Sequence, residues 1–471
     1  MTGFDIRERR NDIGLSQSKL SDITGIEQAR ISAYELGKLN LSINEVNKIA
    51  THLEKIDEPA LLKLKKKRFQ NSQHLDSITA QRPRRGYSKT KRNNEYLEVL
   101  KSLESQFFNP PTTGLKAVSF FAGCGGLCYG VKAAGFEIVA TNELIENYKA
   151  IYELNFPHVN FLPNDVQEIT KSDIEKILKK HKKIDLMVGG PPCQGFSLAG
   201  KRDVNDKRNT LFEYYLKIAE QIQPKVILIE NVRLLTSMKD PNGSLVSKRI
   251  LDTFEKMGYK SNFYSVNAKD YGVPQHRERV IFIAVRKDLK KPSSIAEAKY
   301  GNSINLFNSN PPYFTFGDAV SDLDYLESGE LSTKDKLHRA VKHPEHVIRW
   351  LVDVPEGKSA HDNIDPNLRP PSGYNTTYKR QVWTEPAGTV ATTYGMISGC
   401  RNVHPIATRA LTTREALRLQ SFPDSFKLTG NDGTIRTVIG NAVPPLLGFE
   451  LAKFIKENYT DCDFKCRINA P

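Results

Sequence analysis

A chain of 471 residues, 39% of them hydrophobic, is long enough for more than one domain and a sizeable core. Its net charge of +14 suggests a polyanionic partner, although charge alone does not separate nucleic acid from an anionic membrane surface. No apolar run approaches the roughly 20 residues of a membrane span, and six cysteines are too few for a dense disulfide framework. We therefore expect a soluble, unsecreted, cytoplasmic protein. Cys462 and Cys466 have no second Cys/His pair beside them, so no metal site is expected.

Residues 1–58 have the pattern of a small all-α domain. Apolar residues keep helical spacing through two short segments, with Ser16 placed to cap the second, and Gly25 permits a turn. Residues 28–36 and 43–53 are expected to form two more helices, the first ended by Gly37.

This domain resembles the helix-turn-helix of the Cro/repressor family. The resemblance lies in the Leu15-Ser16-Gln17 start and in the pattern Ile31-Ser32, Tyr34-Glu35 and Gly37. It implies that Gln28, Arg30 and Ser32 face the major groove, where Gln and Arg suit contacts to adenine and guanine edges. A helical bundle used only for dimerisation or packing is the alternative.

Residues 59–114 are expected to form a basic linker. Residues 61–92 carry 11 Lys and Arg against the single acid Asp76, and thus contribute +10 of the net charge. Such a segment can lie along phosphates without reading bases, or it can be a solvated tether.

From residue 115 to 286 the pattern alternates strand and helix, as in a doubly wound (Rossmann-like) α/β sheet. The expected strands are 117–121, 138–141, 184–188, 226–229 and 280–285. The first strand ends in the Gly-rich run Ser119-Phe-Phe-Ala-Gly-Cys-Gly-Gly126, which lets a ligand approach the backbone closely. Glu143 follows the second strand and can accept hydrogen bonds from ribose hydroxyls, and Asp165 can accept from an adenine amino group. Taken singly, each acid is more often a helix cap or a surface charge.

Cys193 lies just beyond the strand 184–188, in the run Gly189-Gly-Pro-Pro-Cys-Gln-Gly-Phe-Ser197. Open parallel sheets bind ligands outside the carboxyl ends of their strands, so a thiol on this loop faces a crevice. That is a position for a nucleophile, although a free cysteine is in general more often a small buried hydrophobe.

These motifs, in this order, resemble those of the DNA (cytosine-5) methyltransferases. Further matches are Glu230-Asn231-Val232, Gln275-His276-Arg277-Glu278-Arg279 and Gly440-Asn441-Ala442-Val443-Pro444. Ser119 departs from the family, which usually has an acid there. The resemblance favours S-adenosylmethionine over NAD. It implies cofactor-binding roles for Phe120, Ala122, Gly123, Gly125, Gly126, Glu143, Asp165, Val166, Pro191, Leu211, Asn441 and Val443.

The resemblance also implies the catalytic residues Cys193, Glu230, Arg277 and Arg279. A thiolate of Cys193 attacks carbon 6 of cytosine, which activates carbon 5, and Glu230 hydrogen-bonds ring nitrogen 3 and the amino group. Arg277 and Arg279 supply positive charge near the base and the flanking phosphate. The target base must be flipped out of the duplex. As alternatives, Glu230 caps a helix and the two arginines form a solvated face.

By the same resemblance, residues 287–405 are an inserted target-recognition domain, and residues 406–471 carry a supporting helix and return to the catalytic domain. We therefore predict a sequence-specific enzyme that methylates double-stranded DNA in a bacterial cytoplasm, paired functionally with a restriction endonuclease. It is not expected to bind a membrane. A transcriptional regulator, acting alone or on its own gene in the same chain, is a second hypothesis, and a tRNA cytosine methyltransferase is a third.

Overall fold

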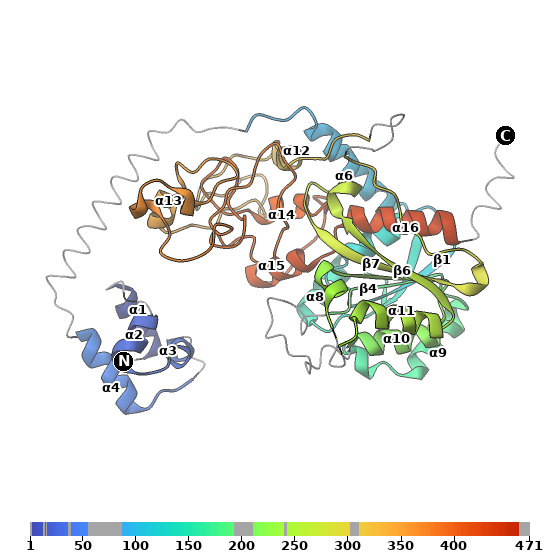
Figure 1. Ribbon diagram of the computed structural model, residues 1–471, viewed down its shortest axis with the longest axis horizontal. Coiled ribbons are helices and arrows are strands. Elements are labelled where there is room, and N and C mark those ends of the chain that lie inside the picture. The colour runs from blue at the N-terminus through green and yellow to red at the C-terminus, as the bar shows by residue number, and fades with distance from the viewer. Residues whose placement is uncertain are drawn as a thin grey trace. The chain divides into compact units, whose positions relative to one another are not determined.

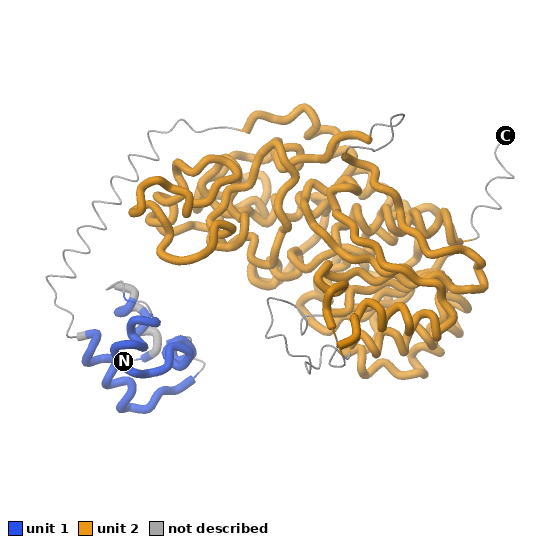
Figure 2. Tube along the Cα trace, viewed as in Figure 1, with its two compact units in different colours: residues 1–85 blue, residues 86–471 orange. Residues whose placement is uncertain are grey.

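The structure is a computed structural model that describes residues 2–12, 15, 17–35, 39–54, 87–192, 211–239, 243–301 and 310–460. It divides into two compact units, residues 1–85 and 86–471 (Figure 2). The expected cap Ser16, the expected helix end Gly37, and Cys193, Cys462 and Cys466 lie outside the described residues.

Unit 1 is a helical domain with a small apolar core. Its helices are α1 (Gly3–Asp12), α2 (Gln17–Thr24), α3 (Gln28–Glu35) and α4 (Ile43–Glu54). Gly25 makes the turn between α2 and α3 with a φ of +67°, as the sequence predicted. Its core consists of Ile6, Leu20, Ile26, Ile31, Leu41, Ile49 and Leu53.

A buried ion pair joins the first and third helices of unit 1. Arg10 Nε lies 2.7 Å from Glu35 Oε1, and Arg10 Nη2 donates to Glu35 Oε2 at 2.9 Å. Gln17 Nε2 also donates to Glu35 Oε2, at 2.7 Å. Burial alone would raise the pKa of Glu35, but the bonds from Arg10 and Gln17 outweigh it and the pKa is lowered.

We expect Glu35→Gln to lower the free energy of unfolding of unit 1 by about 3 kcal/mol, because it leaves the Arg10 charge buried without a counter-charge. The depressed pKa of Glu35 adds stability above the unfolded-state pKa of about 4.3, and this stability is lost as the pH falls through the folded-state value. Hydrogen exchange of the α2 and α3 amides in the full chain measures both effects. The exposed pair Arg30–Glu45 is the control, since Arg30→Gln should cost less than about 1 kcal/mol. Equal losses in the two variants would contradict the prediction.

Unit 2 is built on a seven-stranded sheet of order β3-β2-β1-β4-β5-β7-β6. The strands are β1 (Leu115–Phe120), β2 (Phe136–Thr141), β3 (Asn160–Phe161), β4 (Leu186–Gly189), β5 (Val226–Val232), β6 (Tyr259–Asn267) and β7 (Glu278–Arg286). The strands β1 to β5 pair in parallel, whereas β7 runs antiparallel between β5 and β6. The doubly wound fold is confirmed.

Helices cover both faces of the sheet (Figure 1). One apolar core joins the sheet to α6 (Asn93–Phe108), α7 (Gly126–Ala133) and α16 (Pro445–Tyr459). The other joins it to α9 (Lys171–His181), α10 (Leu211–Ile222) and α11 (Val246–Lys256). The remaining helices are α8 (Glu146–Asn155), α12 (Phe316–Val320), α13 (Glu345–Leu351), α14 (Thr413–Leu419) and α15 (Asp432–Asn441), with the short 3-10 helices η1 (Val166–Glu168), η4 (Arg233–Ser237), η5 (Ala268–Tyr271), η6 (Lys287–Leu289), η7 (Ala360–Asp362) and η8 (Pro366–Leu368).

The expected linker 59–114 is too long at its C-terminal end. Helix α6 lies within that range and belongs to unit 2. Tyr96, Leu100, Leu103 and Phe107 repeat at helical spacing and are buried in the core.

The stretch Asp432–Tyr459 is apolar and long enough to cross a membrane by length and composition alone. Most of it is buried within unit 2, where α16 packs against α7, so it serves as a core element.

Residues 287–405, which we call the recognition region, contain α12, α13 and a small apolar core of their own. That core includes Val347, Leu351 and Val403. The recognition region and the sheet belong to the same compact unit, so a separate recognition domain stays a prediction.

Candidate active site

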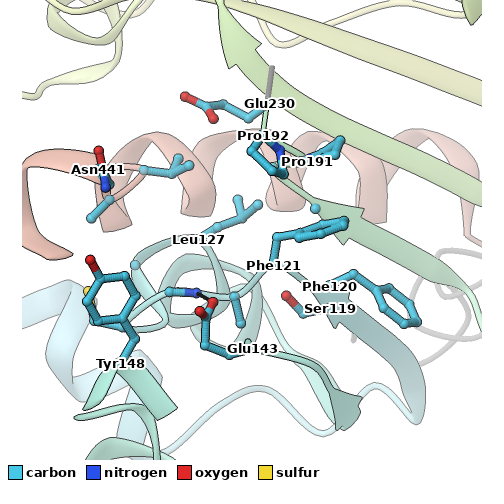
Figure 3. Close-up of a pocket in the computed structure, with 18 of the residues that line it drawn as sticks. Ser119, Phe120, Phe121, Leu127, Glu143, Tyr148, Pro191, Pro192, Glu230 and Asn441 are labelled. Atoms are coloured by element: carbon cyan, nitrogen blue, oxygen red, sulfur yellow. Dashed lines mark hydrogen bonds between the residues drawn. The ribbon is translucent and has the colours of Figure 1, made fainter. Parts of the chain in front are cut away.

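A cavity of about 340 Å³ opens at the carboxyl ends of β1, β2, β4 and β5 (Figure 3). This is the place where the chain order reverses between β1 and β4, and open α/β sheets bind ligands there. All the sequence-predicted cofactor residues except Gly125 line it, and so do Glu230, Arg277 and Arg279.

The Gly-rich loop between β1 and α7 forms the floor of the cavity. Gly125 has a φ of +89°, and a Cβ there would lie 2.6 Å from Phe156 Cε2. A Cβ on Gly126 would lie 2.3 Å from the carbonyl oxygen of Val443. Both positions therefore require glycine, Gly125 for the turn and Gly126 for close contact with the C-terminal motif.

Two consecutive phenylalanines follow different paths at the end of β1. The ring of Phe120 is buried in the core and packs edge-on against Tyr215 at 5.9 Å between centroids. Phe121, which the sequence analysis did not single out, also lines the cavity, and Figure 3 shows the Phe120 ring turned away from it. Phe121 has a φ of 55°, a conformation that the residue type does not signal.

The two acids named from the sequence both reach the cavity. Glu143 Oε2 accepts from the Gly123 amide at 2.8 Å and Glu143 Oε1 from the Ile145 amide at 3.0 Å. Burial raises the pKa of Glu143, although these amides oppose the shift. Asp165 also caps η1, since its Oδ1 accepts from the Gln167 amide at 2.9 Å.

Glu230 and Arg279 meet at the opposite side of the cavity. Arg279 Nε lies 2.7 Å from Glu230 Oε1, and both side chains are largely buried. In the antiparallel pairing of β5 with β7, Arg279 lies opposite Val232, two residues from Glu230. This register brings the Arg279 side chain to the Glu230 carboxylate. A Cβ on Gly190 would lie 3.5 Å from Glu230 Oε2, so the loop after β4 passes against this carboxylate.

Arg277 is buried between the strand end and the C-terminal motif. Its Nη1 donates to the carbonyl oxygen of Gly440 at 3.1 Å, and burial lowers its pKa. With Arg277 only 1% exposed and the Arg279 side chain 14% exposed, the alternative of a solvated arginine face is wrong.

Asn231 lines the cavity, and Gln275 is buried in the segment that leads to Arg277; neither was singled out from the sequence. Asn231 Nδ2 donates to the carbonyl oxygen of Pro191 at 2.9 Å and thereby fixes the start of the Cys193 loop. Gln275 is fully buried and joins Leu419 and Val390 through its amide. Both lie inside motifs already quoted, and for Asn231 a polar residue near the end of the apolar strand β5 was the available signal.

A second cavity of about 370 Å³ adjoins the first and shares Arg279 and Val232 with it. Its lining includes Arg233, His276 and Thr389, whose Oγ1 donates to the His276 carbonyl oxygen at 2.6 Å. The lining also contains Glu278, whose Oε2 lies 2.6 Å from Arg233 Nη1, so its charged groups are paired.

The fold and the main cavity define an α/β domain of the kind that binds its ligands at the switch point of a doubly wound sheet. A family profile described as C-5 cytosine-specific DNA methylase matches residues 115–457, and a helix-turn-helix profile matches residues 6–59. The chain belongs to the C-5 cytosine-specific DNA methylase family and carries a helix-turn-helix at its N-terminal end. It is a DNA (cytosine-5) methyltransferase, and the methyl donor of this family is S-adenosylmethionine.

Curated relatives are of the same kind. The chain is 35% identical to the type II methyltransferase M1.HphI of Haemophilus parahaemolyticus over 74% of this chain and 88% of the relative. It is 30% identical to the type II methyltransferase M.DdeI of Desulfomicrobium norvegicum over 72% of this chain and 88% of the relative. A candidate DNA modification methyltransferase encoded within an E. coli prophage shares the fold, with a TM-score of 0.58 at 23% identity over 73% of this chain and 99% of that one.

Proposed function

We propose that this methyltransferase modifies one cytosine within a fixed sequence of double-stranded DNA, using Cys193 as the nucleophile. The observation that carries the proposal is the convergence on one cavity of the Glu230–Arg279 pair, the Glu143 carboxylate and the Pro191-Pro192 run that leads to Cys193.

In this proposal the Glu143 side of the cavity holds the cofactor. Glu143 is fixed by two amides and accepts the ribose hydroxyls with its remaining lone pairs, while Asp165 accepts the adenine amino group. Gly123, where an added Cβ would meet no atom within 4 Å, leaves room for the cofactor to approach the backbone, and Asn441 and Val443 lie on the cavity wall. When bound, S-adenosylmethionine supplies the methyl group.

We expect Glu143→Ala to weaken S-adenosylmethionine binding about 10- to 100-fold, because hydrogen bonds to a charged acceptor and the Gly123 anchor are lost. The raised pKa of Glu143 further predicts that wild-type affinity begins to fall, on acidification, above the usual glutamate range. Calorimetric titration of the full chain measures both effects. The exposed Glu153, on α8, offers the matched control Glu153→Ala. Equal affinity in wild type and Glu143→Ala would contradict the assignment.

The Glu230 side of the cavity holds the flipped cytosine in this proposal. The Cys193 thiolate forms a bond to carbon 6, and the electron density that moves to nitrogen 3 is stabilised by the Glu230 carboxyl group. Carbon 5 then takes the methyl group and loses its proton, and elimination of Cys193 restores the aromatic ring. Arg279 orients Glu230, and Arg277 fixes the Gly440-Asn441 backbone beside it.

The type II relatives support a restriction-modification setting, in which methylation protects host DNA from a cognate endonuclease. No direct contact with that endonuclease is implied.

Repression of its own gene is a second candidate function, carried by unit 1. Gln28 and Arg30 are exposed on α3, with Ser32 partly exposed beside them, and Arg30 is paired with Glu45 at 2.5 Å. These polar side chains suit contacts to base edges. Footprinting of the full chain on the DNA upstream of its own gene tests this role, and protection that Gln28→Ala leaves unchanged would argue against it.

The methylation itself is tested with purified full-length chain and methyl-labelled S-adenosylmethionine, offered duplex DNA or structured RNA. The proposal expects label in duplex DNA only. Label confined to RNA would replace it with the tRNA methyltransferase hypothesis.

A further inference from the structure

The segment Tyr87 to Asn93 ends at the first residue of helix α6. This segment and the rest of α6 lie outside the stretch 115–457 matched by the family profile. The structure nevertheless builds them into unit 2. We propose that this segment, which we call the strap, positions the recognition region for duplex DNA, with Tyr87 as its anchor. The inference rests on the proposed function, because it assumes that the recognition region engages the DNA around the target base.

Tyr87 is held by three aromatic groups and one ion pair of unit 2. Its ring stacks on His404 at 5.3 Å and packs on Trp383 at 5.2 Å and Tyr325 at 5.3 Å between centroids. Its hydroxyl accepts from Arg409 Nη2 at 3.0 Å, and the same nitrogen lies 2.7 Å from Glu415 Oε1. The anchor thus ties the recognition region to the first turn of α14.

The rest of the strap bonds to the N-terminal part of the recognition region. Thr90 Oγ1 donates to Asp318 Oδ1 at 2.6 Å, and the Thr90 amide donates to Ser321 Oγ at 3.0 Å. Arg92 Nη1 donates to the carbonyl oxygens of Pro312 and Tyr313, both at 2.9 Å.

Asn93 completes these contacts. It is fully buried, and its Nδ2 donates to the Asp318 carbonyl oxygen and to Asp322 Oδ1, both at 2.9 Å. The two bonds made by Nδ2 favour one geometry, because a buried amide donor is costly to leave unpaired.

Helix α6 connects the strap with α7, the helix that follows the Gly-rich loop of the main cavity. Its Phe107 stacks on Tyr129 of α7 at 3.8 Å between ring centroids, and α7 begins at the Gly-rich loop. Tyr96 of α6 donates to the carbonyl oxygen of Arg418 in α14 at 2.5 Å. Figure 1 shows α6 between α12 and α16. The strap and α6 therefore connect the recognition region with the layer that carries the cofactor loop.

The contacts of the strap predict a selective effect. Tyr87 and Thr90 bond to residues of the recognition region and to Arg409, and neither lines the main cavity. Loosening them should change how duplex DNA is held and leave cofactor binding and the chemical step alone.

The test compares Tyr87→Phe with Tyr259→Phe in the full-length chain. Each substitution deletes one buried hydroxyl, but that of Tyr259, in β6, donates to the Pro224 carbonyl oxygen at 2.7 Å, outside the strap and the recognition region. The substrate is a duplex carrying the methylated site mapped in wild-type cells. Active-site titration normalises kcat, so that partial unfolding does not pass for slower chemistry.

For Tyr87→Phe we expect KM for DNA to rise about tenfold, because the hydroxyl loses its hydrogen bond from the charged Arg409 and its contact with His404 Nε2 at 3.2 Å. We expect kcat and KM for S-adenosylmethionine to stay within about twofold. Discrimination against singly substituted sites should fall as well. Thr90→Val should act in the same direction, and Tyr259→Phe should leave both KM values unchanged.

If KM for DNA is unchanged in Tyr87→Phe and Thr90→Val, even with lower thermal stability, the strap stabilises the fold without positioning the recognition region. That result would overturn the inference. Equal rises in both KM values would also overturn it, since they would indicate general loosening. Failure of the wild type to methylate any duplex would remove the proposed function, and this inference with it.

Discussion

Replacing Cys193 by serine is expected to lower kcat by about 10⁴-fold or more while leaving DNA binding intact. A serine hydroxyl is far less acidic than a thiol, so hardly any alkoxide is available to attack carbon 6, and carbon 5 is then not activated. Single-turnover methylation of a duplex substrate measures the chemical step, and a gel-shift titration measures the binding.

Cys400→Ser is the matched control, because Cys400 is an exposed free thiol of the same unit. It should keep wild-type turnover. Substantial turnover by Cys193→Ser would contradict the covalent mechanism, whereas loss of turnover in both variants would point to a general sensitivity of the chain.

Glu230→Gln is expected to lower kcat by about 10²- to 10⁴-fold. The neutral amide of glutamine stabilises the electron density on ring nitrogen 3 less well than a carboxyl group. The substitution also removes the charge that pairs with Arg279, whose Nε lies 2.7 Å from Glu230 Oε1. The binding of S-adenosylmethionine should stay unchanged, since Glu143 lies on the other side of the cavity.

The control for Glu230→Gln is Glu255→Gln, which breaks a surface ion pair with Lys287 and should leave kcat unaltered. A kcat within tenfold of wild type for Glu230→Gln would show that this carboxylate does not serve the chemical step.

Five of the seven strands could be predicted because each is a short apolar run, whereas the two-residue β3 and the half-exposed, polar β6 give no such signal and were not expected. The expected strand 226–229 lies within β5, and 138–141 lies within β2. Their residues are buried on both faces, which makes the run continuous and easy to find.

Other parts of the fold depend on contacts that the sequence does not announce. Helix α6 follows a strongly basic stretch whose composition outweighed the helical spacing of Tyr96, Leu100 and Phe107. The antiparallel insertion of β7 between β5 and β6 is a long-range pairing, and it alone brings Arg279 to Glu230.

The site shows the same division. Motif spacing named Glu143 and Asp165 as partners in one pocket, and the structure places both on the same cavity. Motif spacing could not predict that Arg277 is buried, because this burial depends on the carbonyl groups of Gly440 and Val390, more than a hundred residues away in the chain. Motif spacing also could not find the Tyr87 anchor, because its partners Trp383, His404 and Arg409 lie even farther along the chain; Arg409 is 322 residues away.

Bisulfite sequencing of plasmid DNA from cells that express the full chain, against an empty-vector control, tests the central claim most directly. The account predicts one protected cytosine at a constant position within a short recurring sequence. Complete conversion of every cytosine, with the protein folded and S-adenosylmethionine present, would contradict it.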